Sequence, residues 1–171
     1  MNMKRVLFGV CLGLLLAAPA TAAVTFMDER DGDAAFNQGR YQAAATAYER
    51  GVKLYPDDGN LAMKACRAYA IGNMQLDRAL TLCTSAVYHG GGAPAYNVRG
   101  LVYYRMGRYQ DALKDYDTSY SRRPNHAGTL YMRGMSYLKL GQTSRGETDI
   151  NAAIRLDINI DRQMAAYGIR R

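Results

Sequence analysis

The sequence predicts an all-α protein built as an α-solenoid of about four stacked helix–turn–helix units. The first observation is an internal repeat: Gly39-Arg40-Tyr41-Gln42 returns 68 residues later as Gly107-Arg108-Tyr109-Gln110, and Arg99-Gly100 returns after 34 residues as Arg133-Gly134. The second is the helical spacing of tyrosine, glycine and alanine within each repeat, and the third is the glycine or proline that ends each helical stretch. A repeat of this length is typical of a stack in which each unit contacts only its neighbours.

The N-terminal segment has the layout of a cleaved secretory signal peptide, predicted over residues 1–22. Lys4-Arg5 precedes the 13-residue apolar run Val6–Ala18, and Ala20-Thr21-Ala22 offers the small residues that a signal peptidase requires. A retained membrane anchor is the alternative, but the run is shorter than the about 20 residues that span a bilayer. We therefore expect a periplasmic or secreted protein whose mature solenoid covers residues 23–171.

The first unit is expected at about residues 25–58. It keeps the small, aromatic and proline positions of the repeat: Gly32, Gly39, Tyr41, Ala44, Tyr48 and Pro56. Its first helix is poorly supported, because Asp28–Asp33 is rich in aspartate and glycine, which are weak helix formers. The same acidic cluster would suit the N-terminus of a helix.

The second unit, at about residues 59–92, departs most from the repeat, and its alignment needs one extra residue between Gly72 and Leu76. Cys66 then takes the position of closest approach on the first helix, and Cys83 takes a position where the neighbouring units have tyrosine. Both are expected to face the seam between the two helices. In an exported protein we expect them to form a disulfide, worth about 3 kcal/mol for a loop of about 18 residues. Two buried thiols are the alternative.

The third unit, at about residues 93–126, shows the pattern most clearly. One face of its first helix carries Tyr96, Gly100 and Tyr103, after a proline, Pro94, that suits a first helical turn. Its second helix carries Ala112, Tyr116 and Tyr120. Gly107 separates the two helices and Pro124 ends the second. The two helices are expected to approach most closely at Gly100 and Ala112, where larger side chains would push them apart.

The fourth unit, at about residues 127–160, keeps Gly134, Tyr137, Gly141, Ala153 and Ile154. It departs from the pattern at Gly146, in place of an alanine, and at Ile158, in place of the closing proline. Residues 159–171 carry Ile160, Met164, Ala165 and Tyr167, which would form one apolar face of a short helix. Because a stack leaves the apolar side of its last unit uncovered, we expect this segment to be a capping helix.

These positions, from Tyr96 through Gly100, Gly107 and Ala112 to Pro124, resemble the tetratricopeptide repeat, a helix–turn–helix unit of 34 residues. Tyr96 stands where that family often has tryptophan. The resemblance covers about Thr25 to Ile160. It implies a curved stack whose concave surface is lined by the first helix of each unit and binds a peptide or protein segment.

The side chains expected on this inner surface are those that helical phase leaves out of the packing within a unit. From the first two units they are Phe36, Asn37, Met63, Lys64, Arg67 and Ile71; from the last two they are Asn97, Leu101, Tyr104, Arg105, Tyr131, Met135, Leu138 and Lys139. Aromatic, methionine and cationic groups together suit an extended or helical peptide. About half of the apolar members are expected to pack against the next helix instead. Tyr104, Arg105, Tyr131 and Lys139 are the strongest partner-binding candidates, because tyrosine and cationic groups are informative at interfaces.

Nothing in the sequence indicates catalysis or a cofactor. The two histidines, His89 and His126, fall in predicted loops and are expected to be solvated, and the chain lacks the further ligands that zinc or haem would need. Gly90-Gly91-Gly92 has no preceding strand and no following lysine, so it does not predict a phosphate-binding loop. We therefore expect a protein that is not an enzyme and needs no cofactor or metal.

The charge distribution indicates the kind of partner. Residues 23–98 carry 7 basic and 8 acidic side chains, whereas residues 99–171 carry 13 basic and 7 acidic ones. The basic half is either an ordinary solvated face or a surface that attracts an acidic protein or an anionic membrane. Nucleic acid is disfavoured for an exported protein. The alternative function is a self-association module, in which the basic half docks on the acidic first helix of another copy to form a homo-oligomer.

Overall fold

The computed structural model describes residues 20–171, with side chains from Met27 onward, so residues 1–19 of the predicted signal peptide lie outside it. Over this range the chain contains only helices and their connections, which confirms the all-α prediction. The helices are α1 Ala20–Asn37, α2 Tyr41–Leu54, α3 Gly59–Gly72, α4 Leu76–Tyr88, α5 Gly92–Arg105, α6 Tyr109–Arg122, α7 Ala127–Lys139, α8 Thr143–Leu156 and α9 Ile160–Ala166. None of these described helices is both long and apolar enough to cross a membrane.

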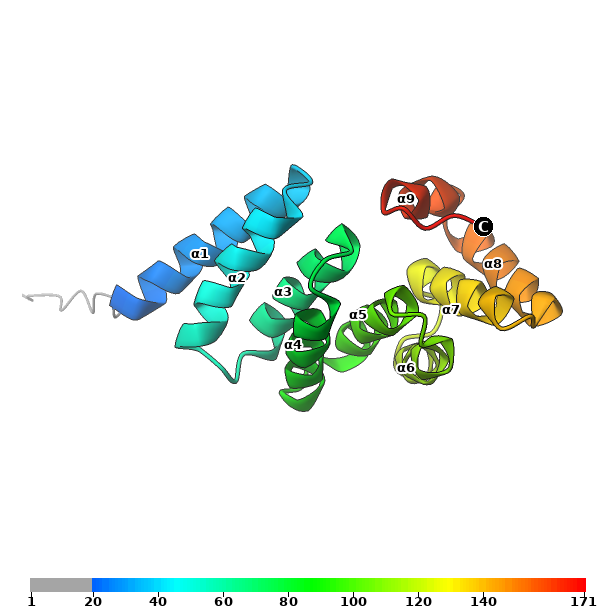
Figure 1. Cartoon of the computed structure of the whole chain (residues 1–171), viewed down its shortest axis with the longest axis horizontal. Helices are drawn as coiled ribbons and strands as arrows, with labels where there is room; N and C mark the ends of the chain where they lie inside the picture. Colours follow the sequence, from blue (N-terminus) through cyan, green and yellow to red (C-terminus); the bar gives the residue numbers. More distant parts are fainter. Residues whose placement is uncertain (1–19) are drawn as a thin grey trace, which may run out of the picture.

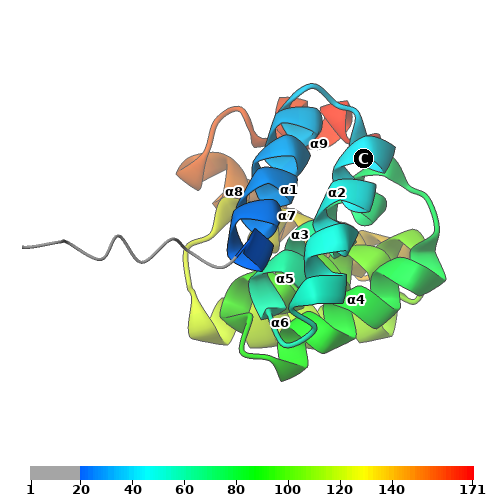
Figure 2. The ribbon, with the colours of Figure 1, turned by 90° about the vertical axis from the view of Figure 1, so that its left-hand side faces the viewer.

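Consecutive helices pair into four antiparallel hairpins that follow one another along the molecule (Figure 1). Seen along the stack, α1, α3, α5 and α7 lie towards the middle, and α2, α4, α6 and α8 lie around the outside (Figure 2). The first helix of each hairpin therefore lines the inner side of a helical solenoid, as the repeat pattern predicted.

A left-handed residue turns the chain between the two helices of each hairpin. Gly39, Gly107 and Gly141 have φ angles of 72°, 74° and 73°, and Asn73 takes the same place in the second hairpin with φ 51°. Asparagine is among the few side chains that tolerate this conformation. Helix α4 then begins one residue later than the 34-residue spacing requires, because Gln75 is inserted with φ 45°. The predicted extra residue is thus present in the turn.

The two helices of each hairpin approach most closely at one corresponding point, where the first helix carries a small residue. A Cβ atom at Gly100 would lie 2.8 Å from the Tyr116 ring, and one at Gly32 would lie 2.5 Å from the ring of Tyr48. The small residue is required because a large buried side chain of the second helix fills the space. The close approach expected at Gly100 is therefore present, and the group that demands it is Tyr116.

Cys66 and Cys83 occupy this same point in the second hairpin. Both side chains are fully buried, and their Cα atoms lie 5.4 Å apart, a distance that a disulfide accommodates. The cysteine pair takes the place of the glycine–tyrosine contact in the neighbouring hairpins. The disulfide remains a prediction that chemical labelling can test.

We expect no reactive thiol at Cys66 or Cys83 when the exported protein is unfolded without reductant, because the bond would hold both sulfur atoms. The measurement is mass spectrometry after alkylation in denaturant, with a reduced sample as the control that accepts two labels at these positions. Two labels on the unreduced protein would contradict the disulfide.

Helix α1 forms despite its weak helix propensity. It begins at Ala20 and runs through the acidic cluster, so the cluster lies within the helix rather than at its N-terminus. The carboxylates pair with other helices: Arg50 donates to Asp28 over 2.8 Å, and Lys64 contacts Glu29 at 2.7 Å. Tertiary ion pairs therefore compensate for the local sequence preference.

Two buried ion pairs tie together the helices of the third and fourth hairpins. Arg99 binds Asp115 through two hydrogen bonds of 2.7 and 2.8 Å, and Arg133 binds Asp149 through two of 2.7 and 2.9 Å. The pairs are related by the 34-residue repeat. The sequence alone does not predict these pairs, because the two members of each lie 16 residues apart.

The chain ends in α9 and a short tail that returns towards the inner side of the stack. Ile160 and Ile169 are buried beside α7 and α8, as a capping segment requires. Gly168 has φ 71° and reverses the chain direction after α9. Figure 1 shows α9 beside α7 and α8. The tail thereby reaches the inner face as well as the end of the stack.

Candidate functional site

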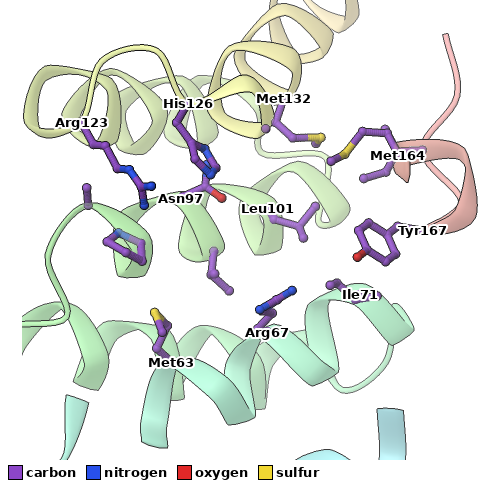
Figure 3. Close-up of a pocket in the computed structure, with 15 residues that line it drawn as sticks. Met63, Arg67, Ile71, Asn97, Leu101, Arg123, His126, Met132, Met164 and Tyr167 are labelled. Carbon is purple, nitrogen blue, oxygen red and sulfur yellow. The ribbon is translucent and has the colours of Figure 1, made fainter. Parts of the chain in front are cut away.

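A cavity of about 270 Å³ lies on the inner side of the stack, between α3, α5, α7 and the C-terminal segment (Figure 3). Its lining residues come from the second, third and fourth hairpins and from the tail. They are Met63, Arg67, Ile71, Ala93, Pro94, Asn97, Val98, Leu101, Arg123, His126, Gly128, Met132, Met164, Tyr167 and Ile169. We call this site the inner pocket.

Most of the inner pocket is apolar. Met63 projects from α3, Leu101 from α5, Met132 from α7 and Met164 from α9, and Figure 3 shows them around one space. Methionine is unbranched and polarisable, so it adapts to ligands of different shape. The lining is therefore suited to one or two large apolar side chains.

Two arginines supply the charge of the inner pocket. Arg67 and Arg123 are exposed, and both side chains are drawn towards the space in Figure 3. The Arg67 guanidinium lies 4.6 Å from the centre of the Phe36 ring. Among the described residues neither arginine forms an ion pair, and none of the residues that line the pocket carries a carboxylate. The site therefore favours an anionic group.

His126 caps α7 and is held in one orientation. Its Nδ1 accepts a hydrogen bond from the backbone N–H of Thr129 over 3.1 Å and lies 2.9 Å from the Thr129 hydroxyl, which accepts from the Asn97 amide over 2.6 Å. Burial lowers the pKa of His126, and the nearby charge of Arg123 lowers it further. The imidazole is therefore neutral with its proton on Nε2, which makes it a hydrogen-bond donor. The expectation of a solvated loop histidine was wrong for this residue, because the helix terminus uses it as a cap.

Acidification should destabilise the protein through His126. The unfolded chain protonates this imidazole near its usual pKa of 6.5, whereas the pKa is lower in the folded protein, so lowering the pH through 6.5 favours unfolding. The variant His126→Asn keeps a side-chain acceptor for the cap and removes the titrating group. Urea unfolding at pH 7.5 and pH 5.5 (about one unit on either side of that value) should show a smaller loss of stability in the variant. Equal losses would contradict the assignment.

Five of the fourteen side chains predicted on the inner surface lie in the lining of the inner pocket, and three of them are Arg67, Asn97 and Leu101. Met63 and Ile71, also expected on the inner surface, lie there too. They come from α3 and α5, where helical phase alone gives the direction in which a side chain points. Their role in binding stays a prediction.

Three other predicted binding residues, Lys64, Tyr131 and Met135, make contacts within the fold. Lys64 contacts the carboxylates of α1, and only 1% of Tyr131 and of Met135 is exposed. The Tyr131 hydroxyl donates a hydrogen bond of 2.8 Å to Asp161 of α9. Burial, and to a smaller extent this hydrogen bond, raises the pKa of Tyr131 to about 12. Tyr131 and Met135 therefore belong to the inner-surface side chains that pack against neighbouring elements.

Three of the predicted residues that lie outside the inner-pocket lining are Tyr104, Arg105 and Lys139. The ring of Tyr104 packs against that of Tyr109 at 5.4 Å, and Lys139 is exposed at the end of α7. Arg105 donates a hydrogen bond to the backbone carbonyl of Tyr167 in the tail. The C-terminal segment thus covers Arg105, whereas Lys139 remains exposed.

Sequence reasoning missed the residues that reach the inner pocket from connections and from the tail. Arg123 and His126 come from the turn between α6 and α7, and Tyr167 and Ile169 come from beyond α9. Helical phase carries no information on such segments. Their placement depends on how the ends of the hairpins meet.

Three family models of the tetratricopeptide repeat match the chain, at residues 32–58, 93–126 and 127–157. The chain belongs to the tetratricopeptide repeat family. The matched segments correspond to the first, third and fourth hairpins, and the stretch between them contains the divergent hairpin with the two cysteines. No curated protein matches the chain significantly.

Several solved tetratricopeptide structures share the fold. A tetratricopeptide protein of Thermus thermophilus, TTC0263, is 23% identical, with a TM-score of 0.71 over 78% of this chain and 74% of that chain. The first tetratricopeptide domain of human RPAP3 is 22% identical, with a TM-score of 0.64 over 71% of this chain and 95% of that chain. A structure of the first such domain of Spaghetti (RPAP3), bound to the HSP90 peptide SRMEEVD, is 22% identical, with a TM-score of 0.64 over 70% and 94%. These similarities show the helical solenoid of repeated hairpins.

Proposed function

We propose that this tetratricopeptide repeat protein is a non-enzymatic scaffold that binds a segment of a partner protein in the inner pocket. The single observation that carries the proposal is an apolar cavity on the concave side, built from three hairpins and flanked by two arginines in no ion pair among the described residues. A structural neighbour with a bound peptide supports the same use of the fold.

The chemistry of the inner pocket favours a segment with large apolar side chains next to a carboxylate. Arg67, Arg123 and the Nε2–H of His126 are hydrogen-bond donors, and the surrounding wall is apolar. Hydrogen bonds between guanidinium and carboxylate groups are among the stronger ones in proteins. The net positive charge of residues 99–171 would speed the approach of an acidic partner.

We further propose that the protein acts after export, in the periplasm or outside the cell. The support is the signal-like layout of residues 1–22 and the two cysteines placed together in the second hairpin. N-terminal sequencing of the protein recovered from the cells that make it should begin at Ala23. A sequence that begins at Met1 would contradict this.

The binding proposal is tested with a phage-displayed library of random peptides of about 12 residues, a length that covers a site of this size when extended. We expect the purified protein to enrich peptides with Asp or Glu next to Leu, Ile, Met or Phe, and calorimetry should show one-to-one binding of the synthetic peptides. Failure to enrich any peptide, or enrichment of basic peptides, would contradict the proposal.

A further inference from the structure

We infer that the C-terminal segment, Ile160–Ile169, is part of the binding site and determines which apolar side chain the inner pocket accepts. This inference rests on the proposed peptide-binding function. It assigns to the tail a second role besides covering the end of the stack.

The C-terminal segment is fixed to the stack at both of its ends. Ile160, at the start of α9, is 2% exposed, and Ile169, after the turn at Gly168, is 3% exposed. Between them the backbone N–H of Ile169 donates to the carbonyl of Met164 over 3.0 Å, which closes the turn. A segment held in this way presents its side chains in defined positions.

Polar contacts from the inner face of two hairpins fix the same segment. Arg105 of α5 donates to the Tyr167 carbonyl, and Tyr131 of α7 donates to Asp161 over 2.8 Å. Asp161 also pairs with Arg171 at 2.5 Å. Arg105 and Tyr131 stand at positions where the inner surface would otherwise meet a partner. The tail therefore covers Arg105 of the third hairpin and Tyr131 of the fourth.

Met164, Tyr167 and Ile169 of this segment pack against the core and also line the inner pocket. Met164 and Tyr167 lie near Ile71 and Leu101 in Figure 3. The two side chains from the tail therefore close one end of the inner pocket. The pocket is thereby limited at the fourth hairpin. Its depth for an apolar side chain depends on the volumes of Met164 and Tyr167. Arg105 is a positioning residue, because it holds the backbone that carries the Tyr167 ring.

The test compares peptide selections against three forms of the full chain: the wild type, Tyr167→Ala and Met164→Ala. The probe is the same random dodecapeptide library. We expect each variant to shift the preferred apolar residue towards a larger side chain, such as Phe or Trp, and to bind peptides chosen by the wild type about tenfold more weakly, as expected for the loss of a buried contact of about 1.4 kcal/mol. Tyr88→Ala is the matched control, because Tyr88 is 84% exposed and lies outside the lining. It should select the same peptides as the wild type.

The outcomes separate this inference from the proposed function. If the wild type enriches peptides and both variants enrich the same ones with equal affinity, the tail is only a cap and the inference is wrong while the function stands. If no form enriches peptides, the proposed function fails and the inference fails with it. Thermal unfolding verifies that each variant is folded. Tyr167→Leu, which keeps an apolar side chain at this place, replaces Tyr167→Ala if that variant unfolds and should produce the same shift to a smaller degree.

Discussion

Reversing both charges of the inner pocket, with Arg67→Glu and Arg123→Glu, should weaken binding of the selected acidic peptides by at least about 100-fold, or ~2.7 kcal/mol. Each substitution replaces a hydrogen-bond donor with a group that repels the ligand carboxylate. The melting temperature should change by only a few degrees (about the effect of 1 kcal/mol), because both side chains are exposed and neither is in an ion pair among the described residues. Calorimetric titration measures the affinity.

Arg155→Glu with Arg162→Glu is the matched control. Both residues are exposed, lie outside the inner-pocket lining and change the net charge of the protein by the same amount. The control should lose only the small, salt-dependent contribution of long-range attraction. Equal losses in the two double variants would show that total charge, rather than the pocket, determines binding.

Replacing Arg133 by methionine should cost about 3 kcal/mol of stability, because it leaves a buried carboxylate without a partner. The side chains of Arg133 and Asp149 are only 15% and 11% exposed, and Asp117 provides a further contact to Arg133 at 3.0 Å. For a chain of this size the melting temperature should fall by about 6–12 °C. Differential scanning calorimetry measures the change.

Adding Asp149→Leu to Arg133→Met should recover most of this loss. The cost arises from the buried unpaired charge, and two apolar groups of similar size remove that charge from the seam. Recovery below a quarter of the loss would contradict this explanation. The pair Arg99 and Asp115, one repeat earlier, offers an independent copy of the experiment.

The predicted inner-surface residues show that helical phase alone does not predict which side chains stay accessible to a partner. Helical phase directed Arg67, Asn97 and Leu101 towards the concave side, and all three line the inner pocket. Helical phase also directed the side chains of Tyr131 and Arg105 towards the concave side, but the C-terminal segment contacts and covers both of them. Helical phase gives the direction in which a side chain leaves its helix. It gives no information on which other segment of the chain packs against that side chain.

By itself the sequence determined the all-α class, the hairpin repeat, the extra residue in the turn of the second hairpin and the meeting of Cys66 with Cys83. Each of these depends on contacts within one unit of 34 residues, where spacing and residue size are sufficient. The tertiary structure alone decided that α1 forms through its acidic cluster, that Arg99 and Arg133 are buried in ion pairs, and that the tail forms one wall of the inner pocket. Each of these features depends on a contact with a residue from another helix, and the distance and burial of that contact determine its free energy. A local sequence pattern does not predict such contacts.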